Sequence, residues 1–465
     1  MYNAVTDKIK QGLVDISGRD FVAYTPEVLE KFASDETEDL KFLPEVVIWP
    51  GTVEEISEIM KLANREKIPV TPRGGGTGLS GGALPVHKGI VLGLRRFTNV
   101  LEIDKENLFA VVETGVITET FQNMVEAEGL FYPPDPASRG SCFIGGNIAE
   151  NSGGPRAVKY GVTKDWIYGL EVVLPTGEII RPGGKLLKNV SGYNLTQLII
   201  GSEGTLGIAT KAIVRLISKP KFRSVLLATF NDPHTACKIV PRLFHAGITP
   251  SACEFMERDA IKMAEVHLEK EWPDSDAAAQ LLIEIDGNDE EKVNEQIETV
   301  GMMCDENGAR DVLLAETGQK VENLWALRRS IGEAVKSKSI YKEEDTVVPR
   351  AQLADLFVGV KEICKTGGIR SVCYGHAGDG NLHVNLLKEN LSDEEWNTKL
   401  HPLIVEIFEL TVKLGGTISG EHGIGWTQKD YLPIAVPEAD LNVMRKLKKL
   451  FDPNYILNPG KMFAI

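Results

Sequence analysis

Apolar and polar positions repeat at different intervals along the chain, and each repeat predicts a different kind of element. In the first half, short apolar runs bounded by glycine, proline or asparagine are typical of strands. We expect strands at 68–71, 89–94, 100–103, 109–113, 167–174, 179–181 and 208–217. Thr52 is a good N-cap, with Glu54 and Glu55 in the first turn, and predicts a helix that runs to about Glu66. A second helix is expected near 117–128.

The pattern changes after Lys219-Pro220, which indicates a boundary. Strands now alternate with longer amphipathic segments. We expect strands at 225–230, 279–286 and 372–374, and helices at 233–246, 289–307 and 401–414. This order predicts an α+β domain with an antiparallel sheet and helices on one face. A further helix is expected at 438–451, before the tail 457–461.

The length of 465 residues is too great for one ordinary core and predicts two or three domains. We expect an N-terminal helical extension, a glycine-rich domain, the α+β domain and a C-terminal segment. Their expected bounds are 1–40, 41–219, 220–415 and 416–465.

Composition narrows the class of protein. Hydrophobic residues at 43% and charged residues at 25% are typical of a globular protein. No apolar run reaches the 18 or so residues of a transmembrane helix, and no secretory signal is visible at residues 1–20. The net charge of −15 argues against nucleic acid as a partner. Six scattered cysteines without C-x-x-C predict reduced thiols in a cytoplasm and no iron–sulfur cluster on this chain.

Two glycine-rich segments carry the candidate chemistry. Residues 375–385 read Gly-His-Ala-Gly-Asp-Gly-Asn-Leu-His-Val-Asn, and residues 419–425 read Ser-Gly-Glu-His-Gly-Ile-Gly. Two imidazoles and one carboxylate, here from His376, His383 and Glu421, are common ligands of a divalent metal with open positions. His422 is then left as a proton acceptor. Chemistry on an oxygen-bearing small molecule is indicated.

Spacing refines this hypothesis. The glycines between His376 and His383 predict a turn at 376–381, followed by a strand at 382–387 that places His383 and Asn385 on one face. The alternative is that each histidine only satisfies hydrogen bonds in a tight loop. For any one histidine alone the two interpretations weigh equally, and the two segments together favour a site.

The loop after the strand at 68–71 contains Gly76-Thr-Gly78-Leu-Ser-Gly81, which fits G-x-G-x-x-G. A Rossmann site would open a helix at this point. Pro85 and the strand at 89–94 follow instead, so the loop joins strand to strand. Its backbone N–H groups can still bind a pyrophosphate, although a plain turn is the alternative for this loop taken alone.

Four motifs, of which the first overlaps this loop, make the pattern specific. Pro72-Arg-Gly-Gly-Gly-Thr-Gly, Pro133-Pro-Asp-Pro-Ala-Ser, Gly145-Gly-Asn-Ile-Ala-Glu-Asn-Ser-Gly-Gly and Gly201-Ser-Glu-Gly-Thr-Leu-Gly occur in order. They resemble the FAD-binding half of the vanillyl-alcohol oxidase and p-cresol methylhydroxylase (PCMH) flavoproteins. With the histidine segments and Asn458-Pro-Gly-Lys461, the chain resembles their D-2-hydroxyacid dehydrogenase branch, which includes D-lactate dehydrogenases and the D subunit of glycolate oxidase.

The resemblance implies an α+β fold with a two-part PCMH-type FAD-binding domain at 41–219 and a substrate (cap) domain at 220–415. The segment 416–465 would return to the flavin domain. The implied FAD-binding residues are Arg73, Gly74, Gly75, Gly76, Thr77, Gly78, Pro134, Asp135, Ser138, Gly140, Ser141, Gly145, Asn147, Gly204, Ile208 and Asn458. Members with covalent flavin commonly have histidine where this chain has Thr77, so we expect non-covalent FAD. Cys142 is interpreted as a packing residue.

The resemblance also implies the reaction. His376, His383 and Glu421 would hold iron, zinc or manganese, and His422 would act as the general base for oxidation of a D-2-hydroxyacid, with D-lactate the leading candidate. Hydride would pass to flavin N5. Arg328 and Lys342 match substrate-binding positions, although an extra residue near Lys342 departs from the family spacing. Asn385 would donate a hydrogen bond to the substrate.

Other functions remain open. Glycolate and D-2-hydroxyglutarate are alternative substrates, and an alkyl-dihydroxyacetone-phosphate synthase-like transferase shares the flavin half. A non-catalytic electron-relay subunit is a third class. Electrons would pass to electron-transfer flavoprotein or to an iron–sulfur subunit, and by analogy the chain could serve an electron-bifurcating lactate dehydrogenase complex.

Overall fold

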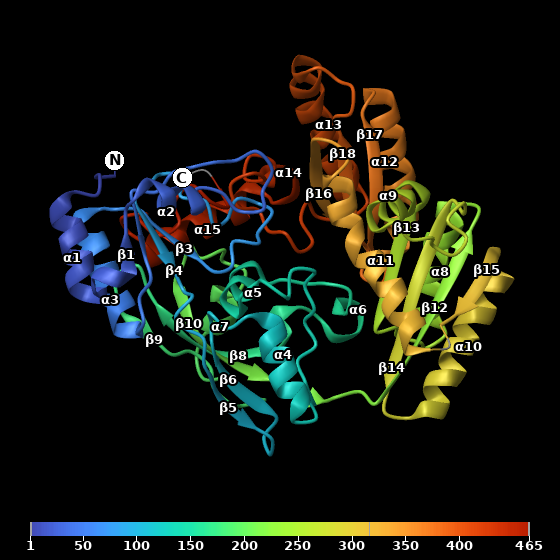
Figure 1. The fold of residues 1–465 in the computed structure, drawn as a ribbon, viewed down its shortest axis with the longest axis horizontal. Helices are drawn as coiled ribbons and strands as arrows, with labels where there is room; N and C mark the ends of the chain where they lie inside the picture. Colours follow the sequence, from blue (N-terminus) through green and yellow to red (C-terminus); the bar gives the residue numbers. More distant parts are fainter. Residues whose placement is uncertain (1, 316, 464–465) are drawn as a thin grey trace. The chain divides into compact units, whose positions relative to one another are not determined.

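The computed structural model describes residues 2–315 and 317–463, and the chain forms two compact units (Figure 1). The first unit comprises Met1–Ser152, Val162–Lys219 and Glu421–Ile465. The second comprises Gly153–Gly161 and Pro220–Gly420. Both segments of the second unit are therefore inserted in the sequence of the first, and the longer one begins at Pro220.

The first unit holds three sheets. A four-stranded sheet has the order β1-β2-β4-β3, and a five-stranded sheet has the order β5-β6-β10-β8-β9. The strands are β1 (Val22–Ala23), β2 (Val46–Ile48), β3 (Val70–Arg73), β4 (Ile90–Gly93), β5 (Val100–Asp104), β6 (Phe109–Glu113), β8 (Ile167–Val173), β9 (Ile179–Ile180) and β10 (Ile208–Arg215). The short pair β7 (Leu130–Phe131) and β11 (Ile217–Ser218) forms the third sheet.

The first unit also contains helices. They are α1 (Asp7–Ser17), α2 (Pro26–Lys31), α3 (Val53–Glu66), α4 (Thr118–Ala127), α5 (Ile144–Glu150), α7 (Leu195–Ile199), α14 (Leu432–Ala435) and α15 (Glu438–Phe451). Thr52 caps α3 as expected, since its Oγ1 accepts a hydrogen bond from the N–H of Glu55 at 3.1 Å. The core joins both ends of the chain, because Ile9 of α1 packs in the same apolar cluster as Ile456 and Leu457.

The second unit is built on one seven-stranded sheet with the order β15-β12-β14-β13-β17-β18-β16. Every neighbouring pair is antiparallel, which confirms the predicted antiparallel sheet. The strands are β12 (Phe222–Phe230), β13 (Ala252–Glu257), β14 (Ala279–Gly287), β15 (Ala309–Leu314), β16 (Tyr341–Val347), β17 (Arg370–His376) and β18 (Asn381–Leu387).

Helices cover both faces of this sheet, so the prediction of helices on one face was wrong. The helices are α6 (Ala157–Tyr160), α8 (Pro233–His245), α9 (Arg258–Leu268), α10 (Glu290–Glu306), α11 (Gly318–Lys336), α12 (Leu353–Gly367) and α13 (Asp393–Lys413). α9 and α11 pack against Leu227 and Tyr374 on one face. On the other face, Phe357 of α12 contacts Phe255 edge-on at a centroid distance of 5.3 Å. The apolar strands of the sheet centre are buried on both sides, which removes the simple alternation that would have indicated two layers.

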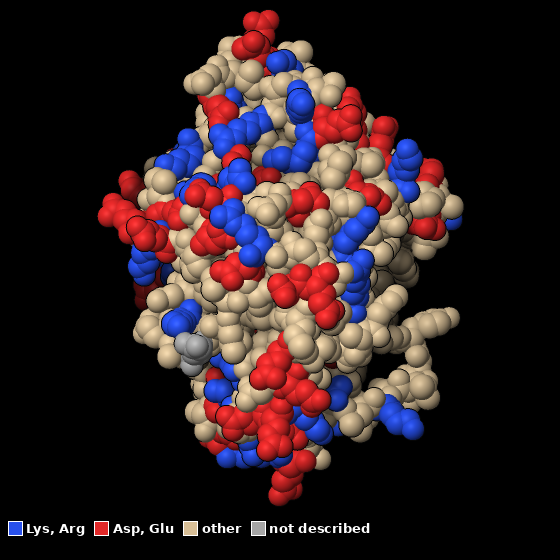
Figure 2. Space-filling view, turned by 90° about the vertical axis from the view of Figure 1, so that its right-hand side faces the viewer, with Lys and Arg blue, Asp and Glu red and all other residues tan. Residues whose placement is uncertain are grey.

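The outer side of α10 is acidic. Its solvent-exposed positions include Glu290, Glu291, Glu295 and Glu298. Figure 2 looks onto this side of the second unit and shows acidic side chains gathered toward the lower end of the view. Across the described residues, no helix combines the length and the apolar character needed to cross a bilayer.

Candidate functional site

A glycine loop leads from β3 to β4 in the first unit. The two strands pair in parallel, and residues 74–89 between them contain no helix, which confirms the predicted strand-to-strand connection. Gly76 has φ +75°, a conformation that side chains rarely adopt. A Cβ on Gly75 would lie 2.4 Å from the carbonyl oxygen of Ser141, so only glycine permits this approach of the two loops.

Arg73 is the last residue of β3 and directly precedes this loop. Its side chain folds against Gly76 and is buried, with Nη2 donating to the carbonyl of Ser34 at 2.8 Å. Nη1 is buried and makes no hydrogen bond among the described residues. Burial lowers the pKa of Arg73, while Asp35 opposes this effect. A buried guanidinium N–H that still needs an acceptor fits an anionic group such as a pyrophosphate.

The segment that contains the expected flavin-lining residues lies beside this loop. Asp135 is buried, and its Oδ1 receives a 2.7 Å hydrogen bond from Arg139. Asn147 lies in α5 and donates to Thr118 Oγ1 at 2.6 Å. The remaining expected residues here occupy the same loop and the start of α5, namely Pro134, Ser138, Gly140, Ser141 and Gly145. Cys142 is buried at 3.3 Å from Thr118 Oγ1, as a packing residue would be.

Asn458 connects two glycine-rich segments by hydrogen bonds. Its Nδ2 donates to the carbonyl oxygens of Gly82 at 3.0 Å and Glu203 at 2.8 Å. Gly204 follows with φ +65°, and a Cβ there would lie 2.9 Å from Pro72. The carbonyl Oδ1 of Asn458 is buried and accepts no hydrogen bond among the described residues. The residues present therefore fit a group that offers both acceptors to Arg73 and a donor to Asn458, as a flavin nucleotide does.

The second unit brings two of the sequence-predicted metal ligands together. His376 ends β17 and His383 lies in β18, with ring centroids 5.3 Å apart and nitrogen atoms within 4.8 Å of one another. Both imidazoles are buried. The predicted strand at 382–387 is confirmed, and its two-residue period places His383 and Asn385 on one face. Two imidazoles at this separation fit a shared divalent metal.

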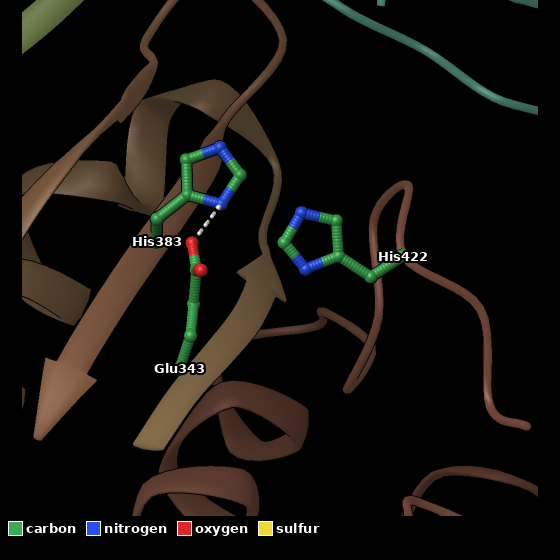
Figure 3. Close-up of side chains that lie close together, drawn as sticks. All are labelled: Glu343, His383 and His422. Atoms are coloured by element: carbon green, nitrogen blue, oxygen red, sulfur yellow. Dashed lines mark ion pairs between the residues drawn. The ribbon is translucent and has the colours of Figure 1, made fainter. Parts of the chain in front are cut away.

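Two residues that sequence reasoning missed hold these histidines. The buried carboxylate of Glu254 in β13 lies 3.0 Å (Oε1) and 2.9 Å (Oε2) from His376 Nδ1. Glu343 in β16 lies beside His383, with 3.4 Å between Oε1 and Nδ1 (Figure 3). Glu254 could have been noticed because it is a charged residue within the apolar run 252–257. A charge that is buried in such a run requires partners.

The expected substrate arginine lies on the same side of the sheet. Arg328 of α11 is buried, and its Nη2 lies 2.6 Å from Glu254 Oε2. Its guanidinium also lies 5.1 Å from the ring centroid of Tyr374. Burial raises the pKa of Glu254, but the charges of His376 and Arg328 outweigh this effect and hold it below its usual value. Arg328 is thus held in place, and its Nε makes no hydrogen bond among the described residues.

Lys342 is not brought to this group. It pairs with Leu386, whereas Glu343 pairs with Asn385 and Asp345 pairs with His383. Paired residues of an antiparallel ladder share a face, so Lys342 lies on the opposite face from the histidines. Lys342 therefore has no part in the function proposed below.

The segment that carries the other two predicted residues begins at a fixed point. Asp345 Oδ2 accepts hydrogen bonds from the N–H of Gly420 at 2.8 Å and from Ser419 Oγ at 3.1 Å. Glu421 follows Gly420 directly in the chain and, with His422, belongs to the first unit. The nearest oxygen and nitrogen of these two side chains are 3.9 Å apart. Figure 3 draws His422 with Glu343 and His383.

Glu203 holds the continuation of this segment within the first unit. Its carboxylate accepts hydrogen bonds from the N–H groups of Ile424 at 2.8 Å and Gly425 at 2.6 Å. The residue after it, Gly204, is one of the expected flavin-lining positions. The glycine segment and the segment with His422 are therefore joined by direct hydrogen bonds.

The glycine loop and the buried Nη1 of Arg73, which lacks an acceptor among the described residues, fit a flavin nucleotide, and the paired imidazoles fit a metal. Residues 44–183 match the FAD binding domain, and residues 219–462 match the C-terminal domain of FAD linked oxidases. The chain belongs to this family of FAD-linked oxidases and is an enzyme.

Full-length relatives support this assignment. The glycolate oxidase subunit GlcD of Bacillus subtilis is 41% identical, with 99% of this chain and 97% of the relative covered. D-lactate dehydrogenase of Anaerostipes hadrus is 37% identical, with 99% and 98% covered. The structure of p-cresol methylhydroxylase has a TM-score of 0.82 at 18% identity and covers 99% of this chain and 98% of its own. That likeness confirms the predicted PCMH-type fold.

Proposed function

We propose that the protein oxidises a D-2-hydroxyacid, with D-lactate the leading substrate, to the 2-oxoacid with FAD and a divalent metal. The observation that carries this proposal is the buried pair His376 and His383 on the sheet face that also holds Arg328. An alcohol oxygen needs a cation or a base beside it, and a carboxylate needs a guanidinium fork. A 2-hydroxyacid carries both groups on adjacent carbons. The D-lactate dehydrogenase of Anaerostipes hadrus, similar over nearly the whole chain, supports this substrate class.

Each side chain then has one task. His376, His383 and Glu421 would hold iron(II), zinc or manganese, since two imidazoles and a carboxylate suit each of these ions. Arg328 would bind the substrate carboxylate, and Asn385 would donate a hydrogen bond to the substrate. His422 would take the hydroxyl proton as general base.

When bound, the metal would acidify the substrate hydroxyl and FAD would accept the hydride from C2. The chain's part is to orient the substrate and to remove its proton. In the flavin site, the sixteen residues expected from the resemblance would hold FAD, with Arg73 and the loop 74–78 at the pyrophosphate and Ile208 and Asn458 among the other contacts. Thr77 stands where a histidine would be required for a covalent bond, which supports non-covalent FAD.

Reoxidation requires a partner. We propose electron-transfer flavoprotein first and an iron–sulfur subunit second, within or outside an electron-bifurcating complex. The relative from Bacillus subtilis is named as a subunit, which supports assembly with other chains. Six free, buried cysteines support a reducing compartment such as the cytoplasm.

Anaerobic mixing of the purified flavoprotein with D- and L-lactate, glycolate and D-2-hydroxyglutarate tests the proposal. We expect D-lactate to bleach the flavin absorbance fastest, and metal analysis of the same sample to give about one ion per chain. Bleaching by no 2-hydroxyacid would overturn the proposal.

Glycolate is the second candidate substrate, because the relative from Bacillus subtilis, at 41% identity, is a glycolate oxidase subunit. Faster bleaching by glycolate than by D-lactate would favour it. The same experiment therefore separates the two substrates.

A further inference from the structure

A buried carboxylate connects a metal-ligand candidate with the substrate arginine. Glu254 lies in the middle of β13 directly opposite His376 of β17, and its side chain is fully buried. An ionised carboxylate in such a position must be matched by charges and hydrogen bonds. Arg328 supplies a charge, and His376 supplies a hydrogen bond.

The contact with His376 has a directional consequence. The carboxylate lies 2.9–3.0 Å from Nδ1, so this nitrogen carries the proton that is donated to Glu254. The other nitrogen, Nε2, is then the one with a lone pair for a metal. A carboxylate behind a histidine fixes the tautomer and orientation of the ring and raises its basicity as a ligand.

The contact with Arg328 uses the same carboxylate. Nη2 lies 2.6 Å from Oε2, and Tyr374 borders the guanidinium on its ring face. One buried group therefore determines the orientation of both side chains. The two side chains come from different elements, α11 and β17, and Glu254 is the shared contact between them.

We propose that Glu254 is a positioning residue that sets the affinity of the site for its metal and aligns Arg328 for the substrate carboxylate. This inference rests on the function proposed above and extends it to a residue outside the metal and substrate contacts. Loss of the carboxylate charge then weakens metal binding and substrate binding together.

The chain offers a matched control. Glu284 is also a buried glutamate, on the neighbouring strand β14 and the same face of the sheet. Its carboxylate accepts hydrogen bonds from Trp325 Nε1 at 3.0 Å and Ser251 Oγ at 3.2 Å. Glu284→Gln therefore reproduces the cost of changing a buried carboxylate in this sheet without touching His376.

The test measures Co²⁺ affinity by competition with a chromophoric chelator, on metal-free flavoprotein that retains FAD. We expect Glu254→Gln to lower the affinity about 10- to 100-fold, the usual effect of losing a group behind a metal ligand. The KM for D-lactate should rise in the same variant. Glu284→Gln should change each quantity less than about threefold. Equal Co²⁺ affinities in Glu254→Gln and Glu284→Gln would overturn the inference.

Glu254→Gln alone leaves Arg328 without its carboxylate, which can cost folding stability. Arg328→Met and the double variant Arg328→Met/Glu254→Gln remove this complication, because the arginine charge is absent from both. We expect Co²⁺ to bind about 10- to 100-fold more weakly to the double variant than to Arg328→Met. Equal binding would contradict the role of Glu254 independently of folding.

Co²⁺ binding to the wild-type protein distinguishes a failure of this inference from a failure of the proposed function. If wild-type protein binds Co²⁺ and His383→Ala does not, the metal site stands, and the variants of Glu254 decide the inference alone. If wild-type protein binds no Co²⁺, the proposed metal site and the inference fail together.

Discussion

Asp345 holds the N–H of Gly420 at 2.8 Å through its carboxylate, and by this bond it fixes the last residue of the second unit beside β16. The same carboxylate binds Asn381 Nδ2 at 2.7 Å. A Cβ on Gly420 would lie 2.7 Å from that Asn381 nitrogen, so a larger residue here would displace the Asn381 side chain. The segment with Glu421 and His422 therefore starts from a defined position.

Asp345→Asn should destabilise the protein. In the wild-type protein both oxygens of the Asp345 carboxylate accept hydrogen bonds. Asparagine replaces one of these oxygens with an NH₂ group, which cannot accept, so at least one buried hydrogen bond is lost. We expect a cost of about 1–3 kcal/mol and a melting midpoint lower by a few degrees. Asp305→Asn, at an exposed position of α10, should leave the midpoint within about 1 °C and serves as the control. An unchanged midpoint for Asp345→Asn would refute the anchoring role.

His422→Asn should retain FAD and metal but slow the reduction of flavin by substrate. The usual effect of losing a general base is about 10²- to 10⁴-fold. Anaerobic stopped-flow absorbance measures this step directly. His267→Asn, at an exposed position of α9, should reduce the flavin at the wild-type rate. Wild-type kinetics in the His422 variant would assign the base to another residue.

Arg328→Lys should raise the KM for D-lactate about 10- to 100-fold, because lysine keeps the charge but loses the bidentate fork. Steady-state kinetics with an artificial acceptor give the value. The adjacent Arg329 is exposed, so Arg329→Lys is a matched control with an unchanged KM. If the two variants behave alike, the carboxylate is bound elsewhere.

Acid precipitation of the purified protein should release all of its flavin into the supernatant. The reason is Thr77, which lacks the nucleophilic imidazole of the covalent members. Absorbance of the supernatant and of the washed pellet gives the two fractions. A pellet that stays yellow after washing would show a covalent bond between the flavin and a residue other than Thr77.

The stability of the apoprotein should depend on the pH through Lys461. Burial lowers the pKa of this amine to about 7, partly opposed by Asp35 and Glu203, and Nζ donates to the carbonyls of Gly81 and Leu84. Between about pH 7 and its ordinary range near 10.5, the unfolded chain binds a proton that the folded protein does not. The free energy of unfolding should therefore rise with pH across this interval.

Lys461→Met removes that titration, and denaturant unfolding of both apoproteins at pH 7 and pH 9.5 measures the difference. The wild-type protein should gain more stability between the two pH values than the variant does. Parallel changes in the two proteins would mean that Lys461 stays charged when folded.

The sequence predicted elements whose signals are local, whereas α9, α12, β13, β15 and β16 of the second unit were not predicted. Thr52 marks the start of α3, and the periodicity of 438–451 predicts α15 with the bounds that the structure has. Long-range relations were harder to predict. Whether helices cover both faces of the second unit's sheet depends on which strands become neighbours. The strand order places β17 and β18 between β13 and β16, and no single segment of the sequence encodes it.

In the candidate site, too, the local relations could be predicted from the sequence and the long-range relations could not. His376 and His383 share a short turn, so their proximity followed from glycine spacing. Glu254 lies more than a hundred residues away and meets His376 only through strand pairing. Glu343 and Asp345 could have been predicted, because a period of two in 341–347 places them on the face opposite to Lys342.

The cluster that joins Ile9 to Leu457 determines the order in which the molecule can be made. Val70 of β3 exchanges backbone hydrogen bonds of 2.7 Å with Ile456 and Asn458, residues that follow the whole second unit in the sequence. The inserted sheet has all seven of its strands by residue 387 and can close while translation continues. Val70 can pair with Ile456 and Asn458 only after the second unit has been synthesised, so a nascent chain can complete the inserted unit before the first one.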